Sequence, residues 1–480
     1  MGTSGIDRGI SRRGFLGTSA AAAALSFVHL TGAGRVCAQP YPKVVADDYT
    51  GRLCFNENPL GPSPEALTAM QSACALAHRY PDWYSGGLES TIAAHHGLSS
   101  ANVCAGAGAT EVIRLVADAL LGPGDELVTA TPTYTQMGSE AVANGASVVH
   151  VPVDGNHVID LDAILAAVGP ATTMVSLVNP NNPLATIFDK TAMESFAEAL
   201  PDDVIVVVDE AYHDYVSSPD YESCIRFFQE GKPFIVVRTL SKAYGLAGSR
   251  IGYALGSSGY ISQIGSSQLF GTISRPSQAA AQAALGDTSH VTNTVALNDQ
   301  AKGMLEAGFT TLGLDFITSH TNFMMFDTGG NASGIASQLS AMGYQVRTGW
   351  GMPQHIRVST GLLSEVQGFL DALTSILVSG VSEDPGLPHA LAVIATYPNP
   401  FNATCNIRLS IPGTEPVNLT IYDLAGRKIR VLENDRMTPG FHQVTWDGRD
   451  FAGRNVASGT YVLNLIQGEF AASSRVSLVK

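Results

Sequence analysis

Alternation between apolar runs and amphipathic stretches dominates residues 41 to 380. The runs are rich in Val and Ile on both faces, which is typical of strands in a parallel sheet that helices cover on both sides. A helix is predicted over Thr110–Leu121, whose apolar residues fall on one face. The pattern therefore predicts an α/β architecture. The predicted strands are Asp125–Ala130, Ser147–Val151, Thr173–Val178, Val204–Val208 and Phe234–Val237.

A different pattern follows residue 380. Residues 381–395 include Asp-Pro-Gly and are predicted to be a linker. Residues 396–480 carry short alternating segments separated by turn sequences such as Asp447-Gly448, which predicts a small all-β sandwich. Its expected strands include Val417–Tyr422, His442–Trp446 and Thr460–Ile466.

The first 38 residues have the features of an export signal. Arginines precede an alanine-rich apolar run, and Val36-Cys37-Ala38 offers small residues for cleavage. Ser11-Arg12-Arg13-Gly14-Phe15-Leu16 resembles a twin-arginine signal, which would imply export machinery that carries folded proteins. An ordinary secretory signal is the alternative. Either signal predicts an exported protein that is periplasmic, cell-surface or secreted.

Charge and cysteine content narrow the possible partners. The formal net charge of −15 repels polyanions, so nucleic acid is not expected as a partner. The six cysteines contain no CxxC pair, so neither a metal site nor a disulfide framework is expected, although one bridge could form after export.

A lysine follows one of the predicted strands directly. Arg238-Thr239-Leu240-Ser241-Lys242 comes after Phe234–Val237, and ligands of α/β proteins bind at the carboxyl ends of strands. A lysine held there with a lowered pKa can attack a carbonyl group, and Arg250 can bind a phosphate. Taken alone, the lysine is ordinarily a surface residue.

An acid ends the neighbouring strand. Asp209 follows Val204–Val208, and a buried carboxylate needs a cation such as a protonated pyridine nitrogen. Tyr212 lies three residues after Asp209, close enough to reach a phenolic oxygen on the pyridine ring whose nitrogen Asp209 would meet. The alternative is an acid that caps the next helix.

Two further segments complete the pattern. Asn182, between two prolines, is a rigid donor for that phenolic oxygen, or simply part of a turn. Gly106-Ala107-Gly108-Ala109-Thr110-Glu111 opens a helix whose free N–H groups attract phosphate, or forms a tight turn. Tyr134 is a candidate to stack on an aromatic ring, or a core aromatic residue.

Together and in this order, these segments resemble the fold-type I enzymes that use pyridoxal 5'-phosphate (PLP), and in particular the histidinol-phosphate aminotransferases. The resemblance covers residues 53–373 and includes Asn56-Glu57-Asn58-Pro59, Arg79-Tyr80-Pro81-Asp82 and His355-Ile356-Arg357-Val358-Ser359. It implies a large domain with a mostly parallel sheet and a smaller α/β domain, within residues 39–380. It also implies a homodimer with shared active sites, an amino donor and a 2-oxo acid acceptor.

The resemblance also assigns roles to individual residues. Lys242 would bind PLP as a Schiff base and move the substrate proton, and Asp209 would pair with the pyridine nitrogen. Asn182 and Tyr212 would hold the phenolic oxygen. The remaining assignments are Tyr134 to the ring; Ala109, Thr110, Ser241 and Arg250 to the phosphate; Tyr80 to the phosphate of the neighbouring subunit; and Arg357, with Arg347 as a weaker candidate, to the acidic group of the substrate.

Two departures from the family pattern leave the substrate open. Leu184-Ala185 replaces the usual Thr-Gly, and Thr110 stands where an acid is frequent. A PLP-dependent decarboxylase similar to threonine-phosphate decarboxylase is one alternative. A catalytically silent secreted binding protein on the same fold is another.

The tail resembles a second known module. Tyr397-Pro398-Asn399-Pro400-Phe401-Asn402, Asp447-Gly448-Arg449-Asp450 and Ala457-Ser458-Gly459-Thr460-Tyr461 are similar to the immunoglobulin-like C-terminal domain of flagellar hook-capping proteins and type IX secretion cargo. The resemblance implies a sorting or attachment domain, with a passive appended sandwich as the alternative.

Overall fold

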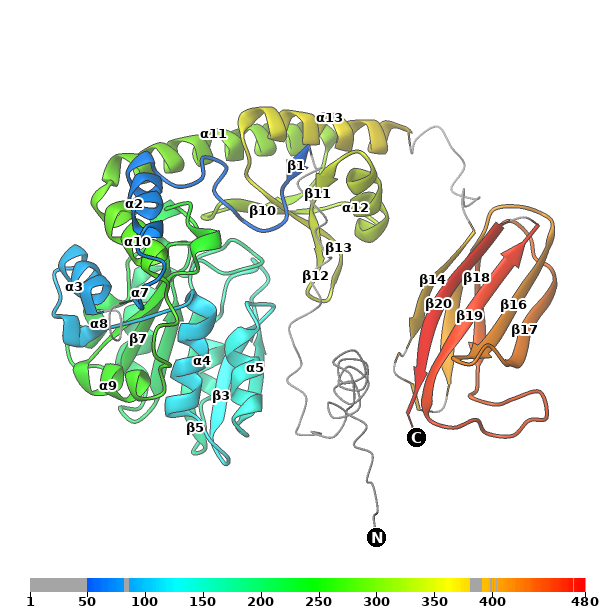
Figure 1. The fold of residues 1–480 in the computed structure, drawn as a ribbon, viewed down its shortest axis with the longest axis horizontal. Coiled ribbons are helices and arrows are strands. Elements are labelled where there is room, and N and C mark those ends of the chain that lie inside the picture. Colours follow the sequence, from blue (N-terminus) through cyan, green and yellow to red (C-terminus); the bar gives the residue numbers. More distant parts are fainter. Residues whose placement is uncertain are drawn as a thin grey trace, which may run out of the picture. The chain divides into compact units, whose positions relative to one another are not determined.

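The structure is a computed structural model that describes residues 50–81, 86–379, 391–397, 399, 401–402, 404–468 and 470–479. The chain divides into two compact units, Met1–Thr374 and Ser375–Lys480 (Figure 1). The signal predicted at 1–38 and residues 381–390 of the predicted linker lie outside the described residues.

A seven-stranded sheet forms the centre of the first unit, in the order β2-β8-β7-β6-β5-β3-β4. The strands from β7 to β4 in this order are parallel, while β8 runs antiparallel to both of its neighbours. The mostly parallel sheet confirms the predicted fold class. Its strands are β2 (Val103–Gly106), β3 (Glu126–Thr131), β4 (Ser147–Pro152), β5 (Thr172–Val178), β6 (Ile205–Asp209), β7 (Phe234–Thr239) and β8 (Gly252–Gly256).

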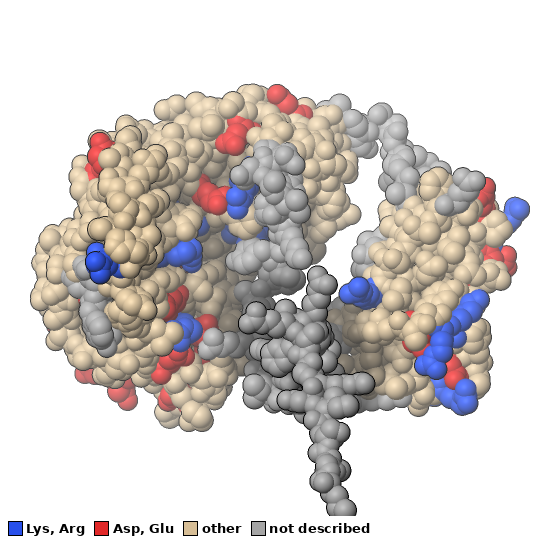
Figure 2. All heavy atoms as spheres, in the orientation of Figure 1, with Lys and Arg blue, Asp and Glu red and all other residues tan. Residues whose placement is uncertain are grey.

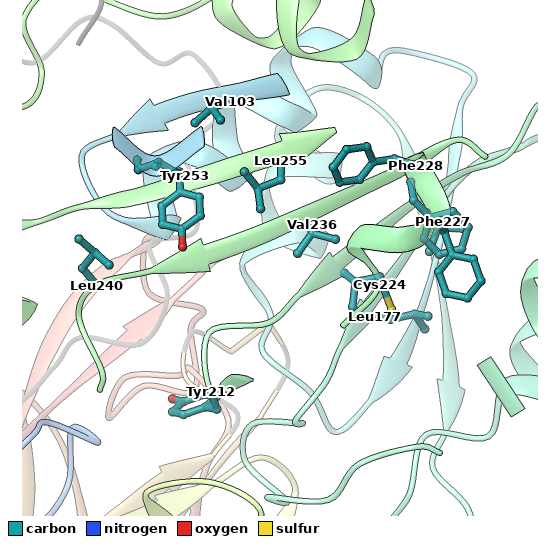
Figure 3. Packing of buried hydrophobic residues seen from close by; sticks show 14 of the residues in the cluster. Val103, Leu177, Tyr212, Cys224, Phe227, Phe228, Val236, Leu240, Tyr253 and Leu255 are labelled. Carbon is teal, nitrogen blue, oxygen red and sulfur yellow. The ribbon is translucent and has the colours of Figure 1, made fainter. Parts of the chain in front are cut away.

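Helices cover both faces of this sheet, so successive strand residues pack into two separate cores. Val206, Val208 and Val236 belong to one buried cluster, part of which Figure 3 shows, whereas Val207 and Val237 belong to the other. This division explains the continuous apolar runs of the sequence, because neither face of the strands meets water. The helices of this domain are α2 (Pro64–Cys74), α3 (Gly86–His95), α4 (Ala109–Leu120), α5 (Gln136–Ala143), α6 (Leu161–Ala167), α7 (Lys190–Ala199), α8 (Ile225–Gln229), α9 (Ser258–Ser266) and α10 (Arg275–Gly286).

A smaller α/β part of the same unit follows the long helix α11 (Thr288–Leu312). Its antiparallel sheet has the order β12-β13-β10-β9, and β1 (Gly51–Arg52) pairs with β11 (Tyr344–Gln345). The first described residues of the chain therefore join this part. The remaining elements are β9 (Phe316–Ile317), β10 (Phe323–Asp327), β12 (Arg347–Gly349), β13 (Met352–Ser359), α12 (Ala332–Ala341) and α13 (Leu363–Ser379).

The second unit is the predicted sandwich. Its sheets have the orders β14-β15-β18 and β17-β16-β19-β20, and Trp446 and Phe401 are fully buried between alternating apolar residues. The short alternating segments of the sequence thus form the strands of two antiparallel sheets. The strands are β14 (Ala392–Tyr397), β15 (Cys405–Ile411), β16 (Pro416–Asp423), β17 (Lys428–Arg436), β18 (Gly440–Trp446), β19 (Gly459–Gln467) and β20 (Phe470–Leu478).

Observed boundaries differ from the predicted ones at a few places. The helix predicted from Thr110 begins at Ala109, and the strand predicted to end at Val208 continues through Asp209. The strand β14 begins at Ala392, inside the range predicted as a linker, because its backbone pairs with β15. A backbone partner far away in sequence extends a strand beyond what local pattern indicates.

Charged residues make up only 14% of the chain. On the face that Figure 2 shows, Lys, Arg, Asp and Glu form a small share of the surface, and acidic and basic atoms adjoin on the second unit. The ion pairs of the second unit include one between Arg427 Nε and Asp423 Oδ2, at 2.7 Å. No helix in the described ranges is long and apolar enough to cross a membrane.

Candidate functional site

A cavity of about 220 Å³ lies where β5, β6 and β7 end and α4 begins. Strand ends of a parallel sheet leave polar backbone groups and loop side chains at one edge, which is where α/β proteins bind ligands. All predicted cofactor and substrate residues except Tyr80 line this cavity. The lining comprises Phe55, Asn56, Ala109, Thr110, Tyr134, Val178, Asn182, Asp209, Ala211, Tyr212, Thr239, Ser241, Lys242, Arg250, Arg347 and Arg357.

The Lys242 amine lies inside the cavity, after the end of β7. Its Nζ donates to the carbonyl oxygens of Phe55 and Asn56, both at 3.1 Å. Burial, followed by the positive charge of Arg357, lowers the pKa of Lys242 to about 8. A much larger share of this amine is therefore neutral and nucleophilic near pH 7 than of an exposed lysine.

The Asp209 carboxyl group ends β6 and is buried. Its Oδ1 accepts the backbone N–H of Ala211 at 3.0 Å, and burial raises its pKa to about 6. A buried carboxylate with so little hydrogen bonding is stabilised by a cation placed against it. This bond closes a turn two residues along the chain and does not cap a helix, because the next helical turn begins at His213 and is preceded by Tyr212.

The Tyr212 hydroxyl group meets two amides. Asn56 Nδ2 donates to it at 2.8 Å, and Asn182 Nδ2 lies 3.5 Å from it. Burial raises the pKa of Tyr212 to about 12, so the hydroxyl keeps its proton at neutral pH. Asn182 and Tyr212 are thus neighbours in the lining of the cavity, close enough to contact the same ligand atom.

An anion-binding corner lies at the start of α4. Gly108, with φ of 82°, precedes Ala109 and Thr110, and a side chain on Gly108 would overlap the Arg250 guanidinium. The Ser241 hydroxyl accepts a hydrogen bond from Thr239 Oγ1 at 2.9 Å on the adjacent strand end. Helix N–H groups, a hydroxyl and a guanidinium together suit a phosphate.

Two arginines occupy the side of the cavity formed by the smaller α/β part. Arg357 on β13 is 2% exposed and donates to Asn182 Oδ1 at 2.6 Å and to the Cys54 carbonyl at 2.8 Å. Arg347 on β12 lies with its guanidinium 5.5 Å from the Trp350 ring, and Arg357 lies 5.0 Å from the same ring. The site therefore presents two cations to a ligand.

Tyr80 lies outside the cavity. Its side chain is 80% exposed, and its ring lies 5.6 Å from that of Phe270. Within one chain it does not reach the anion-binding corner, so the predicted contact requires a second subunit.

Sequence reasoning missed Asn56 and Ser359 as site residues. Both belong to motifs that carry the family resemblance, yet their hydrogen-bond partners come from distant segments. Ser359 Oγ donates to Asn56 Oδ1 at 2.9 Å, although the two residues are 303 positions apart. It also missed the buried pair in which Arg238 donates to Glu210 at 2.8 Å beside Asp209. An arginine inside an otherwise apolar strand was the available signal.

The group that fits this cavity is flat, aromatic, aldehydic and phosphorylated. The amine of Lys242 suits the aldehyde, and the buried carboxylate of Asp209 suits a protonated ring nitrogen. Tyr212 suits a phenolic oxygen, and the corner at Gly108 suits the phosphate.

Comparison with protein families gives two matches. Residues 51–373 match the model described as aminotransferase class I and II, and residues 402–467 match the model described as FlgD Ig-like domain.

Curated relatives are similar over the same region. The histidinol-phosphate aminotransferase of Moorella thermoacetica is 36% identical over 329 residues, which is 68% of this chain and 85% of that protein. Histidinol-phosphate aminotransferase 2 of Methylococcus capsulatus is 38% identical over 339 residues, covering 68% of this chain and 90% of that protein.

Solved structures share the fold. The histidinol-phosphate aminotransferase of Sinorhizobium meliloti, in complex with pyridoxal-5'-phosphate, has a TM-score of 0.66 and 30% identity over 69% of this chain and 92% of that one. A putative histidinol-phosphate aminotransferase from Erwinia carotovora has a TM-score of 0.67 and 28% identity, and the match covers 69% of this chain and 96% of that one.

Proposed function

Since this chain belongs to the class I and II aminotransferase family and is a PLP-dependent aminotransferase, we propose that its amino donor carries a phosphate or carboxylate group. The pairing of Arg357 with Arg347 at one side of the cavity carries this proposal. A guanidinium binds either acidic group through two parallel hydrogen bonds. Histidinol phosphate, named for the relatives, is one such donor.

PLP supplies an aldehyde that accepts the amino group and a ring that withdraws electrons from the substrate carbon. Lys242 would hold the cofactor covalently and would move the substrate proton at its Nζ. Asp209 would keep the ring nitrogen protonated, and Tyr212 with Asn182 would hold the phenolic oxygen. Tyr134 would contact the ring, while Ala109, Thr110, Ser241 and Arg250 would bind the phosphate.

The sheet positions these groups for transfer. Asp209 ends β6 and Lys242 follows the adjacent parallel strand β7, so the carboxylate and the amine approach one ligand from a rigid edge. Arg357 donates to Asn182, so the residue that binds the substrate acid is joined directly to one that holds the cofactor. Arg357 therefore aligns the donor with the ring.

A substrate panel tests this proposal. Purified protein with PLP is offered phosphorylated and unphosphorylated amines and amino acids together with a 2-oxo acid, and products are identified. Formation of a keto acid or aldehyde from the donor, together with an amino acid from the 2-oxo acid, supports transfer of the amino group. Release of CO₂ instead would establish the decarboxylase alternative, and absence of visible absorbance with PLP would establish the silent binding protein.

Arg357→Lys probes the substrate contact. Lysine keeps the charge but loses the two-pronged geometry, so KM for the acidic donor is expected to rise about tenfold or more. Arg226→Lys is the matched control, because Arg226 forms surface ion pairs on α8, including one with Glu222 at 3.2 Å. An unchanged KM in Arg357→Lys would contradict the assignment.

We also propose a homodimer with shared sites. Aminotransferases of this family are commonly dimeric, and the exposed ring of Tyr80 lies 5.6 Å from that of Phe270, whose neighbour in the chain, Leu269, is 66% exposed. Tyr80 would reach the cofactor phosphate of the second subunit. Light scattering of Tyr80→Ala, combined with PLP titration, tests this: weaker PLP binding in an intact dimer supports it, and unchanged binding contradicts it.

Export and sorting form the last part of the proposal. The twin-arginine motif at Arg12 and Arg13 would direct folded protein out of the cytoplasm, and the tail would act as a type IX sorting domain. The match to an Ig-like domain supports a separate module at the tail. Unchanged export of the Arg12→Lys, Arg13→Lys variant would reject the twin-arginine route.

A further inference from the structure

Two amide side chains face the Tyr212 hydroxyl group. Asn56 comes from the segment after β1, and Asn182 comes from the loop after β5. Asn56 Nδ2 lies 2.8 Å from the Tyr212 oxygen, and Asn182 Nδ2 lies 3.5 Å from it, at the outer limit of a hydrogen bond. Each amide can turn either its oxygen or its nitrogen toward Tyr212. This choice decides in which direction the Tyr212 hydroxyl donates its own proton.

Ser359 fixes the orientation of the Asn56 amide. Its Oγ accepts the backbone N–H of Asn56 at 2.8 Å, which leaves the hydroxyl proton for donation to Asn56 Oδ1 at 2.9 Å. With Oδ1 held by Ser359, the Nδ2 group faces Tyr212. Reversing the amide would set two N–H donors against one serine oxygen and leave the serine proton without this acceptor.

Arg357 fixes the orientation of the Asn182 amide in the same way. The guanidinium has donors only, so the Asn182 atom 2.6 Å from it is the oxygen. Asn182 therefore also presents its NH₂ group to Tyr212. Both amides that meet the phenol are donors, and each is held by a different residue of β13.

We infer that Asn56 and Ser359 are positioning residues that hold the Tyr212 hydroxyl with its proton directed into the cavity. A hydroxyl has one proton and two lone pairs, and the amide donors take the lone pairs. The proton is left for an acceptor in the cavity, which under the proposed function is the phenolic oxygen of PLP. The inference rests on that proposed function.

The backbone of Asn56 suits this task. Its φ is 56°, a left-handed conformation that asparagine and aspartate tolerate better than other residues with a side chain. Its side chain is 2% exposed, and its carbonyl accepts Asn322 Nδ2 at 3.0 Å as well as the Lys242 amine. Asn56→Asp keeps the shape and the backbone preference while replacing the NH₂ donor by an acceptor.

A proton donated to the phenolic oxygen has a measurable consequence. It draws negative charge from that oxygen, so the neighbouring nitrogen that links the cofactor to Lys242 holds its proton less tightly. The pH at which the visible absorbance of bound PLP changes is therefore low when the Tyr212 hydroxyl donates to the cofactor. This pH rises when the proton of the Tyr212 hydroxyl points away from the cofactor.

The experiment is a pH titration of the visible absorbance of the holoenzyme. Asn56→Asp turns the Tyr212 proton toward the new carboxylate, and the midpoint is expected to rise by about one pH unit. Ser359→Ala frees the Asn56 amide to reverse, and a smaller rise is expected. Since Ser359→Ala introduces no charge, it carries the test if Asn56→Asp fails to fold, which melting of the apoprotein shows.

Two controls separate orientation from charge. Asn322→Asp introduces the same acid at a side chain that meets the carbonyl groups of Asn56 and Glu57 rather than the Tyr212 hydroxyl, so a smaller shift than in Asn56→Asp is expected. In a Tyr212→Phe background, Ser359→Ala is expected to cause no shift, and Asn56→Asp no more than Asn322→Asp. Equal shifts with and without the phenolic hydroxyl would overturn the inference. Failure of borohydride to label Lys242 in the wild type would instead overturn the proposed function, and this inference with it.

Discussion

At the scale of single residues, burial controls the chemistry of this site. Burial at the end of β7, followed by the positive charge of the nearby Arg357 guanidinium, disfavours the protonated form of Lys242. Burial acts in the opposite direction on Asp209, because there the charged form is the deprotonated one. One environment therefore produces both a nucleophilic amine and an acid that needs a cation.

The lowered pKa of Lys242 predicts how cofactor capture depends on pH. Only the neutral amine attacks an aldehyde, so the rate at which apoprotein incorporates PLP should rise with pH, with a midpoint near 8, and level off at higher pH. Arg357→Gln removes a positive neighbour and should move this midpoint to higher pH. Stopped-flow absorbance measures both. A midpoint near the value of an exposed lysine would contradict the burial of this amine.

The glycine that precedes α4 predicts a defect in cofactor binding. In Gly108→Ala, the added methyl group would overlap the Arg250 guanidinium and displace it, so the Kd for PLP is expected to rise about tenfold or more. Gly124→Ala is the control: its φ of 100° is equally unfavourable for alanine, yet nothing lies within 4 Å. Equal losses of PLP affinity in the two variants would contradict a specific clash.

At the scale of elements, helix α11 shows that position decides the effect of one substitution. Gly303 is exposed, and a Cβ placed there meets nothing within 4 Å. Gly308, in the same helix, faces α13, and a Cβ there would lie 2.5 Å from Leu370 Cδ2. The first glycine only weakens the helix, whereas the second allows two helices to approach closely.

Opposite effects on stability are expected from these two glycines. Gly303→Ala should raise the free energy of unfolding by about 1 kcal/mol, the difference in helix propensity between the residues. Gly308→Ala should lower it by roughly 1–3 kcal/mol, as overpacked cores do. Urea denaturation of each variant measures both values. Stabilisation by both substitutions would contradict the close packing of α11 against α13.

At the scale of the whole molecule, each unit has its own buried core. The sandwich cluster around Trp446 contains residues of the tail only, and the clusters of the large sheet contain none of them. Every residue that lines the candidate site belongs to the first unit. The catalytic part therefore has what it needs to fold and act alone.

Removal of residues 391–480 tests this independence. Since the deletion removes a complete sandwich and no lining residue, kcat and KM should be unchanged, while the location of the protein in the producing cell should change. Enzyme assays and cell fractionation measure the two outcomes. Loss of activity in a truncated protein that still melts cooperatively would contradict the separate roles of the units.

The sequence alone determined the fold class and most of the site. Buried parallel strands are apolar on both faces, so their pattern was visible, and polar residues at their ends stood out against it, as Asp209 at the end of β6 shows. Asn182, Tyr212 and Lys242 follow the same logic, and the family resemblance gave their order a meaning.

Only the tertiary structure decided how those residues are held. Asn56 and Ser359 are 303 residues apart, and nothing in either local pattern indicates that one orients the other. The same is true of Arg357 and Asn182, and of β14, whose start depends on pairing with β15. Hydrogen bonds between distant segments depend on distance and direction in space, whereas a sequence pattern reports burial and backbone preference along the chain.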